Sequence, residues 1–294
     1  MSSITDGKMS QRTQVDLLLD SLVNAPLKDD RALMEFPFFS LEKRPRMEPL
    51  VYDDSKVRIE VKPGASGLAT IWDKDLLIFV TSLINDRLER GLKVSRTVTF
   101  SARELTTLIG RGTGAKVNKQ IQDALLRLRS TTIVTTIKSG DEEEDRGFGW
   151  IESWGVVRRE GRDGKKVMAA LEVTLNDWMF RAIVKDRRVL TISPAYFALT
   201  MGLEKRLYEL ARKHCGGQDR WAITLPKLAE KCGSSRELRK FKAELVGIIE
   251  RNSLPEYALA LQLPLGATPQ RPSNDRVQAV FTPRCGCEFL RSSL

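Results

Sequence analysis

The chain has 294 residues and carries 48 lysines and arginines against 38 aspartates and glutamates, which gives a net charge of +10. This length suffices for about two domains that each bury a core, and the surplus of positive charge favours a polyanionic partner such as nucleic acid. The apolar runs are far shorter than the roughly 20 residues of a membrane span, and 4 cysteines without a signal-like start are too few for a secreted disulfide framework, so we expect a protein of the reducing cytoplasm without membrane contact.

The N-terminal part is predicted as a mobile arm, residues 1–35, followed by a segment that docks on a folded body. The arm is polar apart from one short amphipathic stretch, which is too short for a domain. The apolar segment 35–41 should pack on the body instead. The pattern then predicts a helix from about Asp73 to Gly91, with its apolar side chains on one face and glycine as its stop.

A pattern of a short β-like run, a short helix ending in glycine and a longer basic amphipathic helix occurs twice. The first copy runs from Thr97 through Gly110 to Leu128, and the second runs from Trp221 to Ile248. They align residue for residue up to the glycine, after which the first has about three extra residues. A helix-turn-helix with strands around it places its second helix in the major groove of DNA. The repeat therefore predicts one chain that contacts two adjacent groove segments.

Three β-rich runs follow the first copy and are joined by two turns of opposite charge. The turn at 141–145 is acidic, whereas the turn at 158–166 is mainly basic. Only a basic turn approaches phosphates without repulsion, so we predict that the second turn is the wing of a winged helix. A helix at about 175–185 and a strand at 189–193 follow.

The predicted fold class is α+β, with two tandem winged-helix domains between flexible tails. The first domain spans 36–193, and the second spans 194–264 with a closing strand around 257–263. From residue 265 the chain is rich in Gly, Pro, Ser and Arg without periodicity, so we expect 265–294 to be a disordered tail.

Candidate DNA contacts follow from the helical periodicity of the two copies. In the first copy the apolar positions define a buried face, which leaves Lys116 and Lys119 on the opposite face. After the insertion is allowed for, Arg239 and Lys242 occupy the same positions in the second copy. A solvated basic face would explain either helix alone, but the coincidence favours DNA binding. The expected DNA contacts are Arg111, Thr113, Lys116, Lys119, Gln120, Arg158, Arg159, Lys165, Lys166, Ser234, Ser235, Arg236, Arg239, Lys240 and Lys242.

Enzyme and cofactor sites are not indicated by the sequence. The segment 110–117 is close to a P-loop, but Ala115 stands where that loop needs Gly and Val117 stands where a hydroxyl would hold Mg²⁺. It also follows a helix instead of a strand, so its glycines are interpreted as a turn near DNA phosphates. A single histidine excludes a His-pair metal site, and no acidic cluster accompanies the tyrosines. We expect no cofactor, no metal and no catalytic residue.

Six short segments carry a more specific signal. They are Pro37–Leu41, Gly67–Asp75, Ala124–Leu128, Leu175–Trp178, Glu204–Gly216 and Leu254–Tyr257. Together they resemble the plasmid replication initiator protein A family over about residues 35–264. This resemblance implies a bacterial, plasmid-encoded protein of the cytoplasm, associated with plasmid and nucleoid DNA. Such a protein binds repeated double-stranded origin sites through two winged-helix domains, promotes opening of adjacent A·T-rich DNA and recruits host replication proteins such as the host initiator and helicase. It also implies a homodimer that represses its own gene.

The N-terminal arm contains one further motif. Residues 14–18 resemble the pentapeptide by which bacterial proteins dock in the sliding clamp, with Gln14, Asp16, Leu17 and Leu18 as the expected contacts. An ordinary amphipathic helix explains the same residues. Two other functions stay open for the whole chain: a winged-helix transcriptional repressor without a replication role, and an enzyme such as a nickase or primase.

Overall fold

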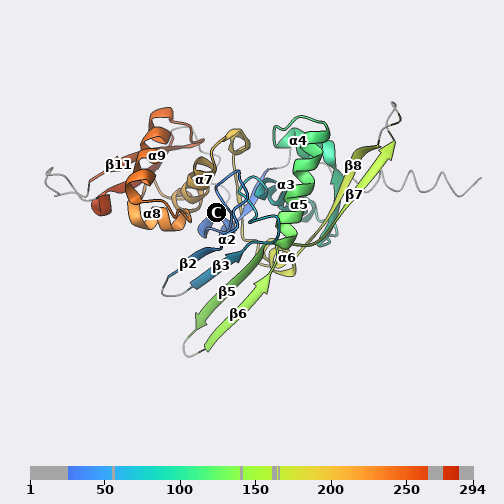
Figure 1. Ribbon diagram of the computed structural model, residues 1–294, viewed down its shortest axis with the longest axis horizontal. Helices are drawn as coiled ribbons and strands as arrows, with labels where there is room; N and C mark the ends of the chain where they lie inside the picture. The colour runs from blue at the N-terminus through green and yellow to red at the C-terminus, as the bar shows by residue number, and fades with distance from the viewer. Residues whose placement is uncertain are drawn as a thin grey trace, which may run out of the picture.

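The computed structural model describes residues 26–54, 57–139, 142–160, 164, 166–263 and 274–284. Helices and antiparallel sheets are mixed along the chain, which confirms the α+β class (Figure 1). The motif residues Gln14, Asp16, Leu17 and Leu18 lie outside the described residues.

The predicted repeat is present as two units with the same succession of elements. The strand order is β4-β8-β7 in the first and β10-β12-β11 in the second, so the last strand of each unit is the central one. Unit one consists of α3 (Lys74–Glu89), β4 (Thr97–Ser101), α4 (Ala102–Leu108), α5 (Ala115–Ser130), β7 (Ile151–Glu160) and β8 (Lys166–Leu175). Unit two consists of α7 (Gly202–Cys215), β10 (Trp221–Thr224), α8 (Leu225–Lys231), α9 (Leu238–Arg251), β11 (Tyr257–Gln262) and β12 (Gln278–Pro283).

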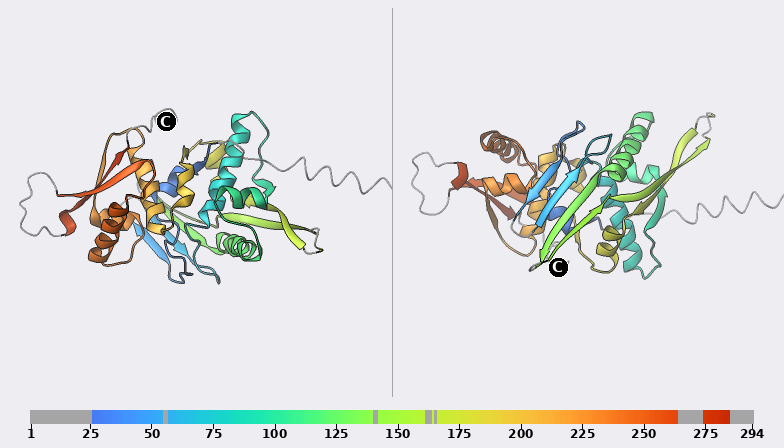
Figure 2. Two further views of the ribbon diagram at one scale, coloured as in Figure 1. Left: turned by 90° about the horizontal axis from the view of Figure 1, so that it is seen from above. Right: turned by 60° about the horizontal axis from the view of Figure 1, so that its bottom comes forward.

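The hairpin β5–β6 is inserted between α5 and β7 of unit one. Together with the N-terminal strands β2 and β3 it forms a separate four-stranded sheet, ordered β2-β3-β5-β6. The hairpins β5–β6 and β7–β8 point in different directions (Figure 2). The predicted turn at 158–166 is shorter in the structure, because Arg158, Arg159 and Glu160 belong to β7 and Lys166 begins β8. The acidic run is mostly strand instead of turn, because residues 142–145 continue the antiparallel ladder with residues 136–139 of β5. The strands are β2 (Leu50–Asp53), β3 (Val57–Lys62), β5 (Thr132–Ser139) and β6 (Glu142–Phe148).

The prediction of a mobile arm over residues 1–35 is wrong for its last residues. β1 (Lys28–Asp30) pairs with β9 (Val189–Thr191), and α2 (Arg31–Glu35) follows directly. The Asp30 carboxylate caps α2 by accepting hydrogen bonds from the backbone N–H groups of Ala32 and Leu33 at 2.8 and 3.2 Å. This order comes from pairing with a strand about 160 residues away, which no local pattern reveals.

The prediction of a disordered tail over residues 265–294 is wrong for residues 274–284. A short 3₁₀ helix (Asn274–Arg276) leads into β12, which pairs with both β10 and β11. Ala279 and Phe281 of this strand are completely buried. Because the neighbouring sequence is rich in Gly, Pro and Ser, its composition gives no sign of this six-residue strand. The strand is held by pairing with β10 and β11, which precede it in the chain.

Two hydrophobic clusters form the core, one centred on each unit, and both include residues of the N-terminal segments. The first contains Phe79, Phe100 and Trp150, and the second contains Phe241 and Phe281. The N-terminal segments lie between the two units (Figures 1 and 2), and α6 (Asp177–Val184) and a 3₁₀ helix (Pro194–Ala198) complete the connection. The domain limits at 36, 193 and 264 stay predictions.

Candidate nucleic-acid interface

Helix α5 of unit one presents a polar face formed by its N-terminal half. Ile121 and Leu125 are at most 2% exposed and face the first core cluster. Lys116, Lys119 and Gln120 are exposed, because they lie on the other side of a helix with 3.6 residues per turn. This is the face that periodicity predicts.

Helix α9 of unit two has the same arrangement, but some of its cations already contact other side chains of the protein. Phe241 and Leu245 are buried in the second cluster, whereas Arg239 and Lys240 are exposed. Lys242 is half-buried and donates a hydrogen bond to Asn274 Oδ1 at 3.2 Å. Lys240 Nζ also lies 3.6 Å from Glu237 Oε2, so Arg239 alone of these three cations has no such partner among the described residues.

The turns before α5 and α9 differ in how far their polar residues reach into solvent. Thr113 and Ser235 are exposed, and Ser234 is half-buried. Arg236 is exposed and forms an ion pair with Glu244. Arg111 instead turns inward: its Nη2 lies 3.5 Å from Asp75 Oδ2 and 3.4 Å from the Trp72 carbonyl oxygen. Arg111 is predicted to contact DNA, but in the structure it contacts the buried carboxylate of Asp75.

The residues predicted to form the wing lie on the hairpin β7–β8. Arg158, Arg159 and Lys166 are exposed. A register shift between Val157 and Arg158 interrupts the ladder just before the two arginines, and such bulges re-aim side chains. Lys165 lies outside the described residues.

Sequence reasoning missed a loop that lies between the two units, residues 41–49, which we call the basic loop. Lys43, Arg44 and Arg46 occupy it, and none of the three forms an ion pair with a described acidic side chain. Lys43 Nζ lies 5.3 Å from the centre of the Trp72 ring. The loop has no periodicity, so the only available signal was its run of cations between prolines.

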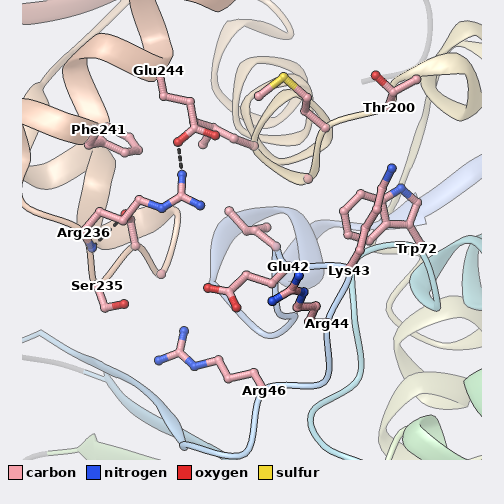
Figure 3. Close-up of a pocket in the computed structure, with 16 residues that line it drawn as sticks. Glu42, Lys43, Arg44, Arg46, Trp72, Thr200, Ser235, Arg236, Phe241 and Glu244 are labelled. Atoms are coloured by element: carbon pink, nitrogen blue, oxygen red, sulfur yellow. Dashed lines mark hydrogen bonds and ion pairs between the residues drawn. The ribbon is translucent and has the colours of Figure 1, made fainter.

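Two depressions border the basic loop and share Lys43 and Trp72. One of about 440 Å³ extends to the turn before α9, including Ser235 and Arg236 (Figure 3). The other, of about 470 Å³, extends to Gln120 of α5. The turn residues of unit two and the polar face of unit one therefore border one continuous surface, whereas the wing residues Arg158, Arg159 and Lys166 line neither depression.

A network of buried charged side chains joins α3, α7 and β1. Lys74 Nζ lies 2.7 Å from Asp29 Oδ2 and 2.8 Å from Glu209 Oε1. Asp75 Oδ1 lies 2.7 Å from Lys205 Nζ. These five side chains are at most 3% exposed. Because an unpaired buried charge is strongly unfavourable, the pairs fix how α3 and α7 lie against each other.

Burial shifts the pKa values in this network toward the neutral forms. It raises the pKa of Asp29 from 3.8 to about 7, although the ammonium group of Lys74 acts in the opposite direction. Burial also raises the pKa of Asp75 and lowers the pKa of Lys205, while the attraction between these two groups opposes both shifts.

The buried network reaches the turns that precede α5 and α9. Asp75 contacts Arg111 at the first turn. At the second, Arg206 lies 3.1 Å from Glu209 Oε2 and donates a hydrogen bond of 2.8 Å to the Lys231 carbonyl oxygen at the end of α8. The two turns are therefore held by the same set of interior charges.

In the described part of the chain, no group of three or more His, Cys, Asp or Glu side chains is placed to hold a metal ion. Burial raises the pKa of the Cys215 and Cys232 thiols to about 11 and about 12, which disfavours the reactive thiolate. In the same part of the chain, every helix is too short or too polar to cross a membrane.

Comparison with known proteins identifies the family. The model of the family "Replication initiator protein A" matches residues 28–259. A protein of Wigglesworthia glossinidia brevipalpis named "Putative replication protein" is 31% identical over 258 residues, which cover 87% of this chain and 92% of the relative.

Two solved structures share the fold at low identity. Domains 2 and 3 of RctB superpose with a TM-score of 0.62 and 14% identity, covering 87% of this chain and 98% of that one. The Pi initiator protein in complex with iteron DNA superposes with a TM-score of 0.52 and 16% identity, covering 79% and 99%. Since the family model spans most of the chain, the protein belongs to the replication initiator protein A family.

Proposed function

We propose that this family member is a plasmid replication initiator that binds repeated origin DNA through two winged-helix units. The observation that carries the proposal is the duplicated order of strand, helix, helix, strand, strand, with exposed cations on the second helix each time. The Pi initiator, whose fold is similar, was solved with iteron DNA. The proposal includes no catalytic step by this chain.

In this proposal, helices α5 and α9 contact the bases, whereas the wing contacts the phosphates. Helices α5 and α9 enter successive major grooves about 10 base pairs apart, with Lys116, Lys119 and Arg239 reaching base edges. Arg158 and Lys166 of the wing hold the sugar-phosphate backbone. Binding to several repeats then promotes opening of adjacent A·T-rich DNA, and the initiator recruits the host initiator and helicase. A homodimer that represses its own gene belongs to the same proposal.

Binding is tested by footprinting on the DNA that flanks the gene of this protein. We expect protected repeats, each with two protected major-groove segments one helical turn apart. Arg239→Ala should weaken binding to a repeat by about 1 to 3 kcal/mol and leave random DNA unchanged. Lys185→Ala, on an exposed residue after α6, is the matched control. Equal losses on both DNAs would make Arg239 a phosphate contact.

Replication itself separates an initiator from a transcriptional repressor of the same fold. The gene is supplied in trans to a plasmid whose only origin is the protected fragment, in a host that cannot replicate it otherwise. Replication of the fragment supports initiation, whereas specific binding without replication would leave only the repressor. Incubation of supercoiled fragment with protein and Mg²⁺ should give no relaxed product, because nicking would contradict the absence of a catalytic role.

A further inference from the structure

We propose that the basic loop, residues 41–49, is a third DNA contact, which enters the minor groove between the two major-groove segments. The inference rests on the proposed DNA binding and adds an element to it. On one face of B-DNA, two successive major-groove segments are separated by one minor groove. A protein element between two recognition helices therefore faces that minor groove. The basic loop lies beside the turn before α9 (Figure 3), and the second depression connects it to Gln120 of α5.

The loop is anchored, so its cations are presented in a defined place. The N–H of Leu68 donates a hydrogen bond to the Arg46 carbonyl oxygen at 2.9 Å. Gly67 has φ +82°, and a Cβ atom there would lie 2.9 Å from Pro45 Cβ. Pro45 of the loop therefore packs directly against the turn at Gly67. Proline also fixes the backbone φ at Pro45. Ordering these residues in advance lowers the entropy lost on binding.

The side chains of the loop suit a narrow, negative groove. Arg44 is exposed and Arg46 is half-buried, and both lack an acidic partner among the described residues. Arginine is the residue that a narrow A·T minor groove attracts most. Two acidic residues share the loop: Glu48 is exposed, and Glu42 lines the depression, where its carboxylate repels DNA phosphates. Glu42 is therefore expected to weaken DNA binding, whereas the arginines strengthen it.

The binding test uses a duplex that contains one footprinted repeat, in which the base pairs between the two protected segments are A·T, G·C or inosine·C. Inosine lacks the guanine amino group, so its pair with C presents an A·T-like minor groove and a G·C-like major groove. We expect the unaltered protein to bind the A·T and inosine·C duplexes equally and the G·C duplex about tenfold more weakly.

Arg44→Ala with Arg46→Ala should weaken binding to the A·T and inosine·C duplexes about tenfold and abolish the discrimination against G·C. Glu42→Gln should strengthen binding to all three. The matched control, Arg181→Ala with Lys185→Ala, removes the same charge from α6 and the turn after it, which line neither depression, and should keep the discrimination.

Three outcomes would overturn the inference. Unchanged binding by the double arginine variant would show that the loop does not contact DNA. Equal losses on all three duplexes would make it a phosphate contact only, and preference for A·T over inosine·C would place the discrimination in the major groove. If the unaltered protein does not prefer its repeat over random DNA, the proposed function fails as well, and that result is separate from these three.

Discussion

At the residue scale, the most unusual feature is one ammonium group between two buried carboxylates. Lys74 contacts both Asp29 and Glu209, and all three side chains are at most 2% exposed. Glu209 is also paired with Arg206 at 3.1 Å, so the main effect on Asp29 is burial, which removes its carboxylate from water. Burial therefore raises the pKa of Asp29 to about 7, and this carboxyl group gains a proton near neutral pH.

The raised pKa gives the free energy of unfolding a defined pH dependence. The ordinary pKa of Asp29 is 3.8 and its value in the folded protein is about 7, so the folded state binds more protons between these values. The stabilising contribution is complete below about pH 3.8 and is lost as the pH rises through about 7. In Asp29→Asn, the unfolding free energy should fall less steeply between pH 5 and 8, by at most about 1.4 kcal/mol per pH unit.

Urea unfolding at pH 5, 6, 7 and 8 measures this slope. Asp53→Asn is the control, because Asp53 is exposed on β2 in a surface ion pair with Arg58 and should keep the slope of the unaltered protein. Identical slopes for Asp29→Asn and the unaltered protein would show that Asp29 does not take up a proton in this range.

At the element scale, α5 and α9 are related by their buried faces as well as by their cations. Leu125 and Leu245 are both completely buried at comparable positions of the two copies. Leu125→Ala and Leu245→Ala should each lower the free energy of unfolding by about 2 to 5 kcal/mol, because each leaves a cavity. The neighbours Leu126 and Val246 are 44% and 38% exposed, so their replacement by Ala should cost less than about 1 kcal/mol. Similar costs at buried and exposed positions, by urea unfolding, would contradict the assigned faces.

Strand β12 should be essential to unit two although it follows an apparently featureless segment. It is the central strand of its sheet, and Phe281 is completely buried. A chain that ends at Leu263 loses both ladders of β12 and leaves the core of unit two open to water. We expect this chain to lose the near-UV circular dichroism signal of Trp221, whose ring stacks on Phe281 at 5.1 Å.

A chain that ends at Arg284 is the control for this truncation. It keeps every described strand, so its near-UV spectrum and unfolding curve should match those of the complete chain. A stable, fully folded unit two in the shorter chain would show that β12 is dispensable.

At the scale of the whole molecule, the sequence predicts the parts with strong local patterns. The two copies have helical periodicity and glycine stops, so α4, α5, α8 and α9 are found close to their observed limits. The hairpin β7–β8 follows from two β-rich runs on either side of a turn. β1 and β12 are missed, because short strands are ordered by partners far away in the chain.

The candidate site is also predicted only in part, because contacts between distant segments determine the rest of it. In the sequence, α7 resembles a solvated amphipathic helix because Lys205, Arg206 and Glu209 alternate with leucines. In the structure α2 packs on α7, and the first residues of α3, Lys74 and Asp75, pair with Glu209 and Lys205, so the charges become the interior network. The basic loop was missed because an irregular segment has no period to detect, and its position between the units depends on the complete fold.

The proposed binding through two units should depend steeply on salt, because in this proposal both units neutralise phosphates of one duplex. With about eight phosphates neutralised, log affinity should fall against log salt with a slope near −7. Replacement of Arg158, Arg159 and Lys166, which are exposed on the wing, by Ala should make the slope less steep by about three units. The preference for the repeat over random DNA should persist, since phosphate contacts carry no sequence information. Fluorescence anisotropy titrations between 50 and 300 mM salt measure both quantities, and an unchanged slope would remove the wing from the interface.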